Sequence, residues 1–327
     1  MGMKQEITFS GKVKEELSKQ WSEDRHCQIA ELTAIISLCG SISINEENQY
    51  FVKINTENLT VARKYFMLIK ETFNASPEIL LRRNLNLKKS KVYTVVVRDS
   101  KVSLKILEAA KLLDEDGEIR EILSLTDNLI IRNACCRRAF IRGAFLASGS
   151  MSDPAKTYHF EIVTTTMEKA EQIQSIICFF DIDAKIVIRK KYFVVYVKEG
   201  SQIVDLLNIM EAHVSLMELE NVRILKEMRN SINRQVNCET ANINKTVAAA
   251  TKQIEDIQYI KDTIGFSKLS EGLEEIAKLR LEHPDASLKE LGALLSPPIG
   301  KSGVNHRLRK LGEIADNLRE EKEREEW

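Results

Sequence analysis

Small residues at every fourth position of one predicted helix constrain this chain more than any other feature. Within residues 138–154 the sequence predicts a helix in which Ala139, Gly143 and Ala147 share a stripe, and Gly149 ends the helix. The distance between two packed helices is set by the side chains at their contact, so this stripe lets a partner backbone approach closely. A terminal glycine also allows a left-handed exit from the helix. We therefore expect a partner helix with a matching stripe.

A matching stripe lies in the segment 28–44. A shift of 109 positions aligns Ala30 with Ala139, Ala34 with Gly143, Cys39 with Ser148, Gly40 with Gly149 and Ser41 with Ser150. Self-similarity at a fixed offset is the signature of an internal repeat. The first two-thirds of the chain is therefore predicted to be a duplication with a seam of two helices at its centre.

The same order of elements follows each of the two motif helices. The first copy predicts a hairpin over 41–54, a helix over 57–73 capped by Thr56, a hairpin over 78–98 and a helix over 102–113. The second copy predicts a strand over 158–163, a helix over 167–180, a hairpin over 184–197 and a helix over 201–210. Ser10 is expected to cap a short helix over 11–19. We predict an α+β domain over 1–215 with two pseudo-symmetric lobes (duplicated αββαββα), about 1–113 and 132–215.

Only helical patterns remain from about residue 216, where we place a helical connector over 216–250 and an all-α domain over 251–327. The asparagine-rich stretch 229–246 predicts a cap-and-turn region. Helices are expected over 269–282, over 288–295 with a capping box from Ser287 and Glu290, and over 303–315 with Ser302 as the cap. The break at 296–300 gives the last two helices the spacing of a helix-turn-helix.

Charge indicates which helix of this domain would face DNA. From Ser296 to Gly312 there are four cations and a histidine, with no acid. The hydroxyl and amides near the helix start suit a phosphate, and Asn305 and Arg309 suit base edges. The expected contacts are Lys301, Ser302, Asn305, His306, Arg307, Arg309 and Lys310. The alternative is a basic surface helix in a protein–protein module.

A second basic patch is predicted on the hairpins of the two lobes. Its members are Arg82, Arg83, Lys88, Lys89 and Lys91 in the first copy and Lys185, Arg189, Lys190 and Lys191 in the second. Two such hairpins related by a pseudo-two-fold could straddle a duplex and contact its backbone. Solvated hairpin turns explain the same lysines equally well.

Composition and residue spacing limit which other classes of function are possible. Because 48 Lys and Arg balance 48 Asp and Glu, nucleic-acid binding must depend on local patches. No apolar run of membrane-spanning length and no signal-like start occur, so we expect a cytoplasmic, nucleoid-associated protein without a membrane partner. The six cysteines and five histidines are scattered, without a Cys-x-x-Cys pair. We expect buried free thiols, no metal site and no cofactor.

The duplicated motif ending in Gly-Ser resembles the LAGLIDADG homing-endonuclease fold. In that family each motif helix offers an acid just before its terminal glycine to hold catalytic metal. The matching positions here are Cys39 and Ser148, which lack carboxylates, and Asp153 lies beyond the helix. A thiol and a hydroxyl hold Mg²⁺ poorly, because that ion prefers hard anionic oxygen ligands. The resemblance implies the scaffold and argues against the reaction.

Several longer strings resemble the bacterial WhiA family. They are residues 142–154 and 158–161, Asn-Cys-Glu-Thr-Ala-Asn at 237–242 and Leu-Ser-Pro-Pro-Ile-Gly-Lys-Ser-Gly-Val-Asn-His-Arg-Leu at 295–308. The family joins a degenerate homing-endonuclease domain to a helix-turn-helix domain. The resemblance implies a protein that binds double-stranded DNA and acts in transcription regulation, or in cell division and chromosome segregation, without nuclease activity.

Three hypotheses for function follow. The first is a non-catalytic DNA-binding regulator whose helix-turn-helix reads bases. The second is a division or segregation factor whose lobes are a scaffold for transcription or division proteins. The third, and the weakest, is an active metal-dependent endonuclease. The internal pseudo-symmetry means that no homodimer is required, so a monomer is plausible.

Overall fold

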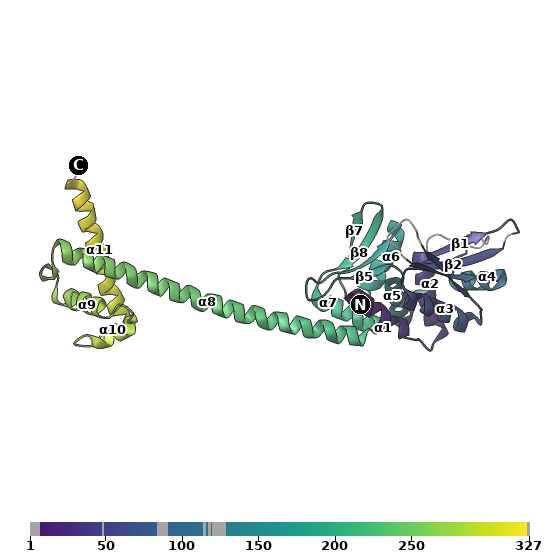
Figure 1. Ribbon diagram of the computed structural model, residues 1–327, viewed down its shortest axis with the longest axis horizontal. Helices are drawn as coiled ribbons and strands as arrows, with labels where there is room; N and C mark the ends of the chain where they lie inside the picture. The colour runs from purple at the N-terminus through teal and green to yellow at the C-terminus, as the bar shows by residue number, and fades with distance from the viewer. Residues whose placement is uncertain are drawn as a thin grey trace, which may run out of the picture. The chain divides into compact units, whose positions relative to one another are not determined.

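The computed structural model describes residues 7–47, 49–83, 91–113, 116, 119 and 129–325. They form two compact units, Met1–Lys226 and Glu227–Trp327, which we call unit 1 and unit 2. Most of their helices and strands are labelled in Figure 1. Among the described residues, no helix is long and apolar enough to cross a membrane.

The first lobe of unit 1 is a four-stranded antiparallel sheet with helices packed against it. Its elements are α1 (Phe9–Lys19), α2 (Arg25–Cys39), β1 (Gly40–Ile44), β2 (Tyr50–Thr56), α3 (Leu59–Phe73), β3 (Glu78–Arg83), β4 (Lys91–Val97) and α4 (Ser100–Ala109). The strand order is β1-β2-β4-β3. Alternate strand residues such as Val52, Ile54 and Val95 are fully buried, because successive side chains of a strand point to opposite faces.

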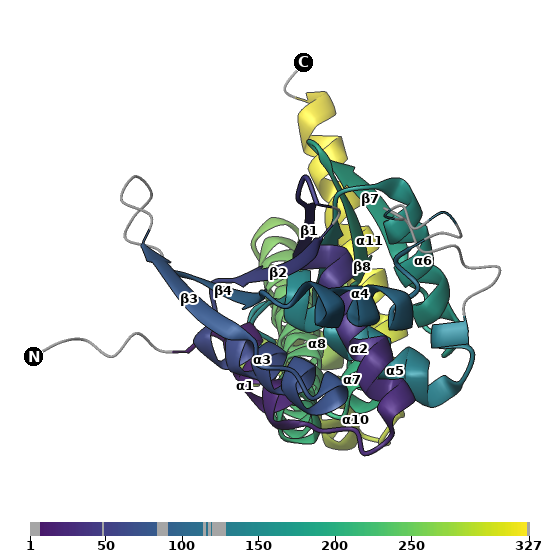
Figure 2. The same ribbon diagram turned by 90° about the vertical axis from the view of Figure 1, so that its right-hand side faces the viewer.

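The second lobe repeats this plan. After η1 (Leu129–Ile131) come α5 (Ala134–Ser148), β5 (Gly149–Met151), β6 (Phe160–Thr164), α6 (Met167–Cys178), β7 (Lys185–Arg189), β8 (Tyr192–Val197) and α7 (Gly200–Met210). The strand order β5-β6-β8-β7 matches that of the first sheet. In Figure 2 the motif helices α2 and α5 lie side by side, with the strands of both lobes around them. The predicted duplication and the α+β class are confirmed.

The small-residue stripe brings the backbones of α2 and α5 into contact. A Cβ added to Gly143 would overlap the carbonyl oxygen of Glu31 and lie 3.2 Å from the Cβ of Ala34. A real side chain at this position would therefore force the two helices apart. The expected left-handed exit at the end of the helix is wrong, because Gly149 has a φ of −78°. Its small size serves packing instead, since an added Cβ would overlap the ring of Phe145.

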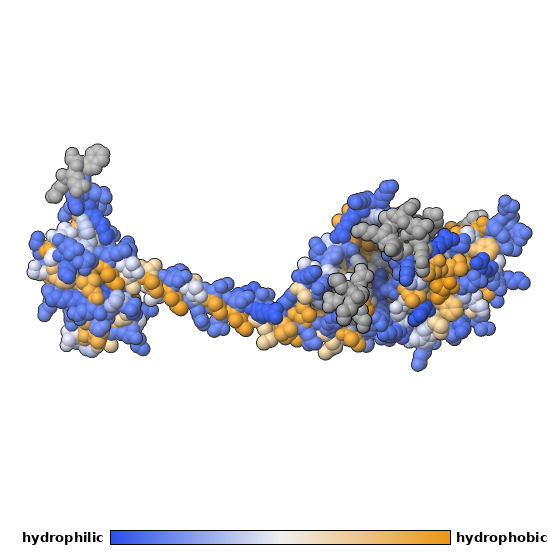
Figure 3. Space-filling view, viewed as in Figure 1, coloured by the Kyte–Doolittle hydropathy of each residue, from blue (hydrophilic) through white to orange (hydrophobic). Residues whose placement is uncertain are grey.

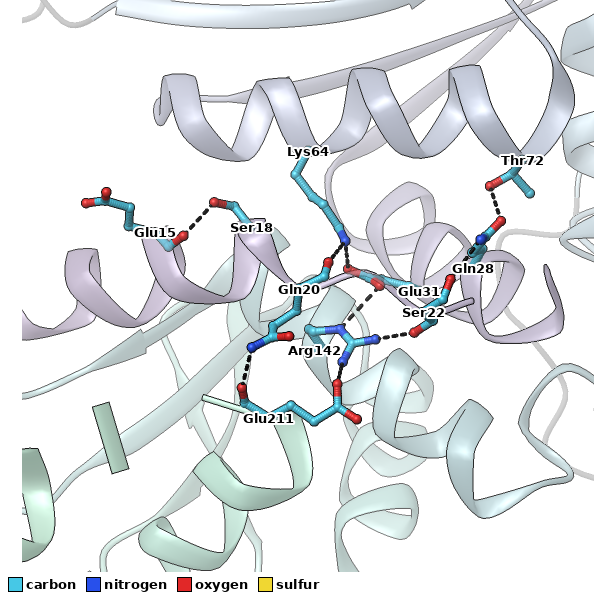
Figure 4. Close-up of polar contacts among 10 residues, drawn as sticks. All are labelled: Glu15, Ser18, Gln20, Ser22, Gln28, Glu31, Lys64, Thr72, Arg142 and Glu211. Atoms are coloured by element: carbon cyan, nitrogen blue, oxygen red, sulfur yellow. Dashed lines mark hydrogen bonds and ion pairs between the residues drawn. The ribbon is translucent and has the colours of Figure 1, made fainter. Parts of the chain in front are cut away.

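A buried ionic network crosses the same seam (Figure 4). The carboxylate of Glu31 on α2 lies 3.4 Å from the Lys64 ammonium of α3 and 3.3 Å from Nε of Arg142 on α5. Arg142 also donates at 2.6 Å both to the carboxylate of Glu211, which follows α7, and to the hydroxyl of Ser22. Desolvating three charges is costly, and the cost is offset only where all partners meet. The network is complete only in the observed register of the helices.

Several helix starts differ from the sequence prediction. The hydroxyl of Thr8, not of Ser10, accepts the Gly11 amide at 3.2 Å and caps α1. Asn58, not Thr56, caps α3, because its side chain accepts the amide of Thr60 at 2.9 Å. In both cases a second residue of capping type stands two positions away, and sequence alone does not choose between them.

Unit 2 is entirely helical in the part of the chain described. It contains α8 (His213–Thr263) from Glu227 onward, followed by η2 (Phe266–Lys268), α9 (Glu271–Glu282), α10 (Leu288–Leu294) and α11 (Lys301–Glu325). Its core includes Ile257, Ile260, Ile276, Leu291 and Leu308, each at most 2% exposed. The predicted cap-and-turn region at 229–246 is wrong, since these residues continue α8.

Exposed apolar side chains follow α8 at helical spacing. Met228, Ile232 and Val236 are four residues apart, as are Ile243 and Val247, and all five are more than half exposed. Figure 3 shows orange patches along this helix. These apolar positions keep the period of a helix through the asparagine-rich stretch, and that period outweighs the preference of asparagine for turns.

Substitution of Glu31 tests the ionic network. We expect Glu31→Gln to lower the free energy of unfolding of unit 1 by about 3–5 kcal/mol, because buried Lys64 loses its carboxylate partner and Arg142 keeps only Glu211. Burial already lowers the pKa of Lys64, opposed by the charge of Glu31. The folded variant therefore binds fewer protons than the unfolded chain, so the loss should shrink as pH rises toward about 10.4, the ordinary lysine pKa. Urea unfolding across pH measures both effects.

A surface carboxylate provides the control. Glu15 pairs with Lys19 at 3.1 Å in solvent, so Glu15→Gln should cost less than about 1 kcal/mol. Equal losses for the two variants would contradict the role assigned to Glu31.

Candidate nucleic-acid interface

The predicted DNA-contact residues of unit 2 all lie on α11, which packs against α8, α9 and α10. Val304, Leu308, Leu311 and Ala315 form the buried side of α11, as the sequence predicts. They pack with residues of α8, α9 and α10 in one apolar cluster. The opposite side of α11 is thereby left for solvent or a ligand.

A glycine fixes the turn between α10 and α11. The amide of Ile299 donates to the carbonyl of Gly292 at 3.0 Å. A Cβ added to Gly292 would overlap the carbonyl oxygen of Ile299 and lie 3.1 Å from Val304. The turn therefore packs directly on the backbone of α10, and this contact sets where α11 begins.

The start of α10 is built as predicted. The hydroxyl of Ser287 accepts the amide of Glu290 at 3.3 Å, and the Glu290 carboxylate accepts the Ser287 amide at 2.7 Å. The hydrogen bond from the Ser287 backbone amide to the carboxylate is the main cause that lowers the pKa of Glu290. The capping box is confirmed.

Most of the predicted contact residues lie on the exposed side of α11. Ser302, Asn305, His306 and Arg309 are exposed and lie opposite the apolar spine at helical periodicity, and Lys301 and Lys310 flank them. The expectation that Ser302 caps the helix is wrong, because α11 already begins at Lys301. Ser302 is instead in the first turn, where backbone amides have no partner within the helix.

Two arginines of this helix have protein partners. Arg307 is half-buried and donates to the carbonyl of Gly272 at 3.2 Å, so it ties α11 to α9. Arg309 is 75% exposed and lies 3.3 Å from the carboxylate of Glu313, one turn further on. An exposed pair of this kind is weak and can be exchanged for a phosphate or a base. Of the two, Arg309 remains available to a ligand.

Some cations of the second basic patch already form ion pairs with neighbouring acids. Arg189 lies 3.0 Å from the carboxylate of Glu161, and Lys185 lies 3.3 Å from that of Asp183. Lys190 and Lys191 are exposed at the turn between β7 and β8. In the first lobe, Arg82 and Lys91 are exposed on β3 and β4, the side chain of Arg83 is not described, and Lys88 and Lys89 lie outside the described residues.

The motif ends, where a homing endonuclease holds metal, offer no carboxylate. Burial raises the pKa of Cys39 to about 12, so its thiol is neutral near pH 7, and it donates to the Ile35 carbonyl at 3.2 Å. The buried hydroxyl oxygen of Ser148 has no hydrogen-bond partner among the described residues. Asp153 uses its carboxylate to accept the amide of Ala155 at 2.9 Å.

One carboxylate near the second motif end was not singled out from the sequence. Glu161 on β6 accepts hydrogen bonds from Ser150 at 2.9 Å, His159 at 3.0 Å and Arg189 at 3.0 Å. Partial burial raises its pKa, but these hydrogen bonds and the charges of His159 and Arg189 lower it by more. Glu161 is thus an anion engaged by three donors. Strand alternation alone does not identify such a cluster.

The expectation of scattered cysteines is also wrong at one place. His26, Cys27, Cys135 and Cys136 meet at the N-terminal ends of α2 and α5. No short spacing reveals this group, because its two halves are contributed by different lobes.

Comparison with known proteins finds relatives that match nearly the full length of the chain. It matches the WhiA N-terminal LAGLIDADG-like domain over residues 25–113, the WhiA LAGLIDADG-like domain over 137–229 and the WhiA C-terminal HTH domain over 232–315. The probable cell division protein WhiA of Lachnoclostridium phytofermentans is 60% identical over 314 residues, which cover 96% of this chain and 100% of that protein. The chain belongs to the WhiA family.

Other members of the WhiA family agree in length and fold. The probable cell division protein WhiA of Alkaliphilus oremlandii is 52% identical over 97% of this chain and 99% of its own. The crystal structure of full-length WhiA from Thermotoga maritima covers 95% of this chain and 98% of its own, with a TM-score of 0.58 at 23% identity. Two LAGLIDADG-like lobes and a helix-turn-helix domain are therefore the architecture of this WhiA chain.

A pair of glycine substitutions tests how α11 is positioned. We expect Gly292→Ala to lower the free energy of unfolding of unit 2 by about 1–3 kcal/mol, because the added methyl group meets backbone that cannot yield. Gly312→Ala is the matched control, since its Cβ would lie 3.5 Å from a carboxylate oxygen of Asp256, an ordinary contact. That change should be neutral or stabilise by up to about 1 kcal/mol through helix propensity. Thermal unfolding measures both, and equal shifts would contradict the packing argument.

Proposed function

We propose that this chain is a non-catalytic regulator that binds double-stranded DNA and acts in transcription regulation, in cell division and chromosome segregation, or in both. One observation carries the proposal. The first turns of α11 present an exposed, acid-free surface opposite a buried apolar spine, at the helix-turn-helix position of the fold. The names of the relatives, probable cell division proteins, support a role in division.

The chemistry of this surface divides into base contacts and phosphate contacts. The major groove of DNA admits an α-helix and presents a donor and acceptor pattern that differs for each base pair. Asn305 can pair with adenine and Arg309 with guanine through two hydrogen bonds each. Lys301, Lys310 and the free amides beside Ser302 suit phosphates, which position the helix without reading sequence.

The lobes have a different role in the proposal. Arg189 and Lys185 are already paired with acids, so the second hairpin offers DNA mainly Lys190 and Lys191. This favours lobes that add a modest backbone contact or recruit a transcription or division protein. The rival hypothesis is a scaffold with weak DNA contact. It predicts that α11 contributes little to DNA affinity, whereas ours predicts a large contribution.

Absence of nuclease activity is part of the proposal. A neutral thiol and a hydroxyl stand at the two motif ends, and the nearby carboxylates of Asp153 and Glu161 are held by local hydrogen bonds. Two-metal cleavage of a phosphodiester needs oxygen anions that are free to bind the ions.

Salt-dependent DNA titrations with single variants test whether α11 contacts bases and phosphates. Arg309→Ala should weaken binding of the preferred site by about 1–3 kcal/mol and relax specificity at one position. Lys310→Ala should weaken all sequences alike and reduce the slope of log K against log salt by about 0.9. Lys322→Ala, exposed near the other end of α11, is the control and should change neither quantity.

The same titration separates the two roles of the lobes. If the turn of the second hairpin contacts backbone, Lys190→Ala with Lys191→Ala should reduce the slope by up to about 1.8, twice the value for one phosphate. An unchanged slope assigns the lobes to protein binding. Full affinity in both α11 variants would remove that helix from the interface and favour the scaffold hypothesis.

Incubation of supercoiled plasmid with the protein and Mg²⁺ or Mn²⁺ tests the absence of catalysis. We expect no nicking above the level of a metal-free control. Nicking that disappears in Glu161→Gln or Asp153→Asn would overturn the non-catalytic assignment and identify the carboxylate responsible.

A further inference from the structure

Four metal-ligand side chains converge at the N-terminal end of the seam in unit 1. His26 and Cys27 are in the first turn of α2, and Cys135 and Cys136 are in the first turn of α5. One ligand atom from each lies within 4.8 Å of every other. Nδ1 of His26 is 3.2 Å from Sγ of Cys136 and 3.3 Å from Sγ of Cys27. The cluster joins the two lobes at the end opposite the terminal glycines of the motif helices.

The internal repeat places these residues in register. The shift of 109 positions that aligns the two motif helices also aligns His26 with Cys135 and Cys27 with Cys136. Each lobe thus supplies two adjacent residues from the first turn of its motif helix. Because the pseudo-two-fold relates the two lobes, the same two positions occur twice, and together they supply four ligands.

We propose that this cluster is a structural Zn²⁺ site, with the thiolates of Cys27, Cys135 and Cys136 and Nδ1 of His26 as ligands. Structural zinc is tetrahedral and takes Cys₃His sets, with Zn–S near ~2.3 Å and Zn–N near ~2.0–2.1 Å. The edges of such a tetrahedron are about 3.5–3.8 Å long. The observed separations therefore need only small side-chain shifts. On binding, three thiols lose protons to solvent and the neutral imidazole donates its lone pair.

The outer surroundings of His26 fit the same assignment. Its Nδ1 faces the cysteines, and its Nε2 lies 3.7 Å from the carboxylate of Asp24. Asp24 precedes α2 but makes no side-chain capping hydrogen bond, so its carboxylate is available to the ring. A carboxylate behind a histidine fixes the tautomer of the ring and raises its basicity as a zinc ligand.

Ligand chemistry selects zinc over the metal of a nuclease. Three thiolates and an imidazole are soft or borderline donors, whereas Mg²⁺ requires oxygen. All four tetrahedral positions are filled by protein, which is the pattern of a structural site and leaves no position for substrate. The ion would hold the first turns of α2 and α5 together across the seam.

Metal content and Co²⁺ substitution in the full-length chain test the site. Reduced, folded protein purified without chelator should contain one Zn²⁺ per chain by mass spectrometry. After removal of zinc, Co²⁺ should produce a sulfur-to-metal charge-transfer band and the strong visible bands of a tetrahedral complex. Chelation should lower the thermal midpoint of unit 1, and added Zn²⁺ should restore it.

Variants of the exposed ligands avoid changes to the core. Cys135→Ser and His26→Ala should each lose the one-to-one zinc content and weaken Co²⁺ uptake at least tenfold. Cys178→Ser and Cys238→Ser, also at exposed cysteines, should retain both. Circular dichroism checks that all four variants are folded.

Three results would overturn the proposal. The first is reduced wild-type protein that takes up neither Zn²⁺ nor Co²⁺. The second is metal content that is equal in the ligand variants and the controls. The third is a disulfide within the cluster, recognised because the intact mass rises on reduction and free thiols appear.

Discussion

Close contact between two helix backbones is the constraint on which the first unit depends. A side chain at Gly143 would overlap the backbone of α2 at Glu31, so the helices meet only through small residues. That approach places the carboxylate of Glu31 between Lys64 and Arg142, away from water. The steric fit and the ion network act together, because the network can close only where the backbones touch. Each lobe therefore uses the other as part of its core.

The architecture of the first unit could be predicted from the sequence because the motif helix of the seam occurs twice in it. Repeated small residues at one offset identify both motif helices, and strand alternation identifies both sheets. Helix ends were predicted less well, since Ser10 and Thr56 are suitable caps that lost to Thr8 and Asn58. The asparagine-rich part of α8 was missed because local preference opposed a helix, while its apolar residues kept a helical period.

The candidate DNA interface could also be predicted from the sequence only in part. The exposed side of α11 follows from helical periodicity, so Asn305 and Arg309 could be placed from sequence. The hydrogen bond of Arg307 to the carbonyl of Gly272 could not, because it depends on the packing of α9. The histidine–cysteine cluster lies within the register that reveals the repeat, but short ligand spacings such as Cys-x-x-Cys do not identify it. An internal duplication brings together residues that are distant in sequence, so ligand spacing must be read across the two copies as well as along each.

The two ends of the seam differ in a way that fits a binding protein. At the end where a homing endonuclease holds its metal, Cys39 is neutral and the hydroxyl oxygen of Ser148 is buried without a hydrogen-bond partner among the described residues. At the other end, four soft ligands converge and leave no open position in a tetrahedral set. A closed set of this kind stabilises a fold and does not cleave a phosphodiester bond. In the proposed site the ion joins the two lobes at the seam, and DNA recognition is proposed for α11 instead.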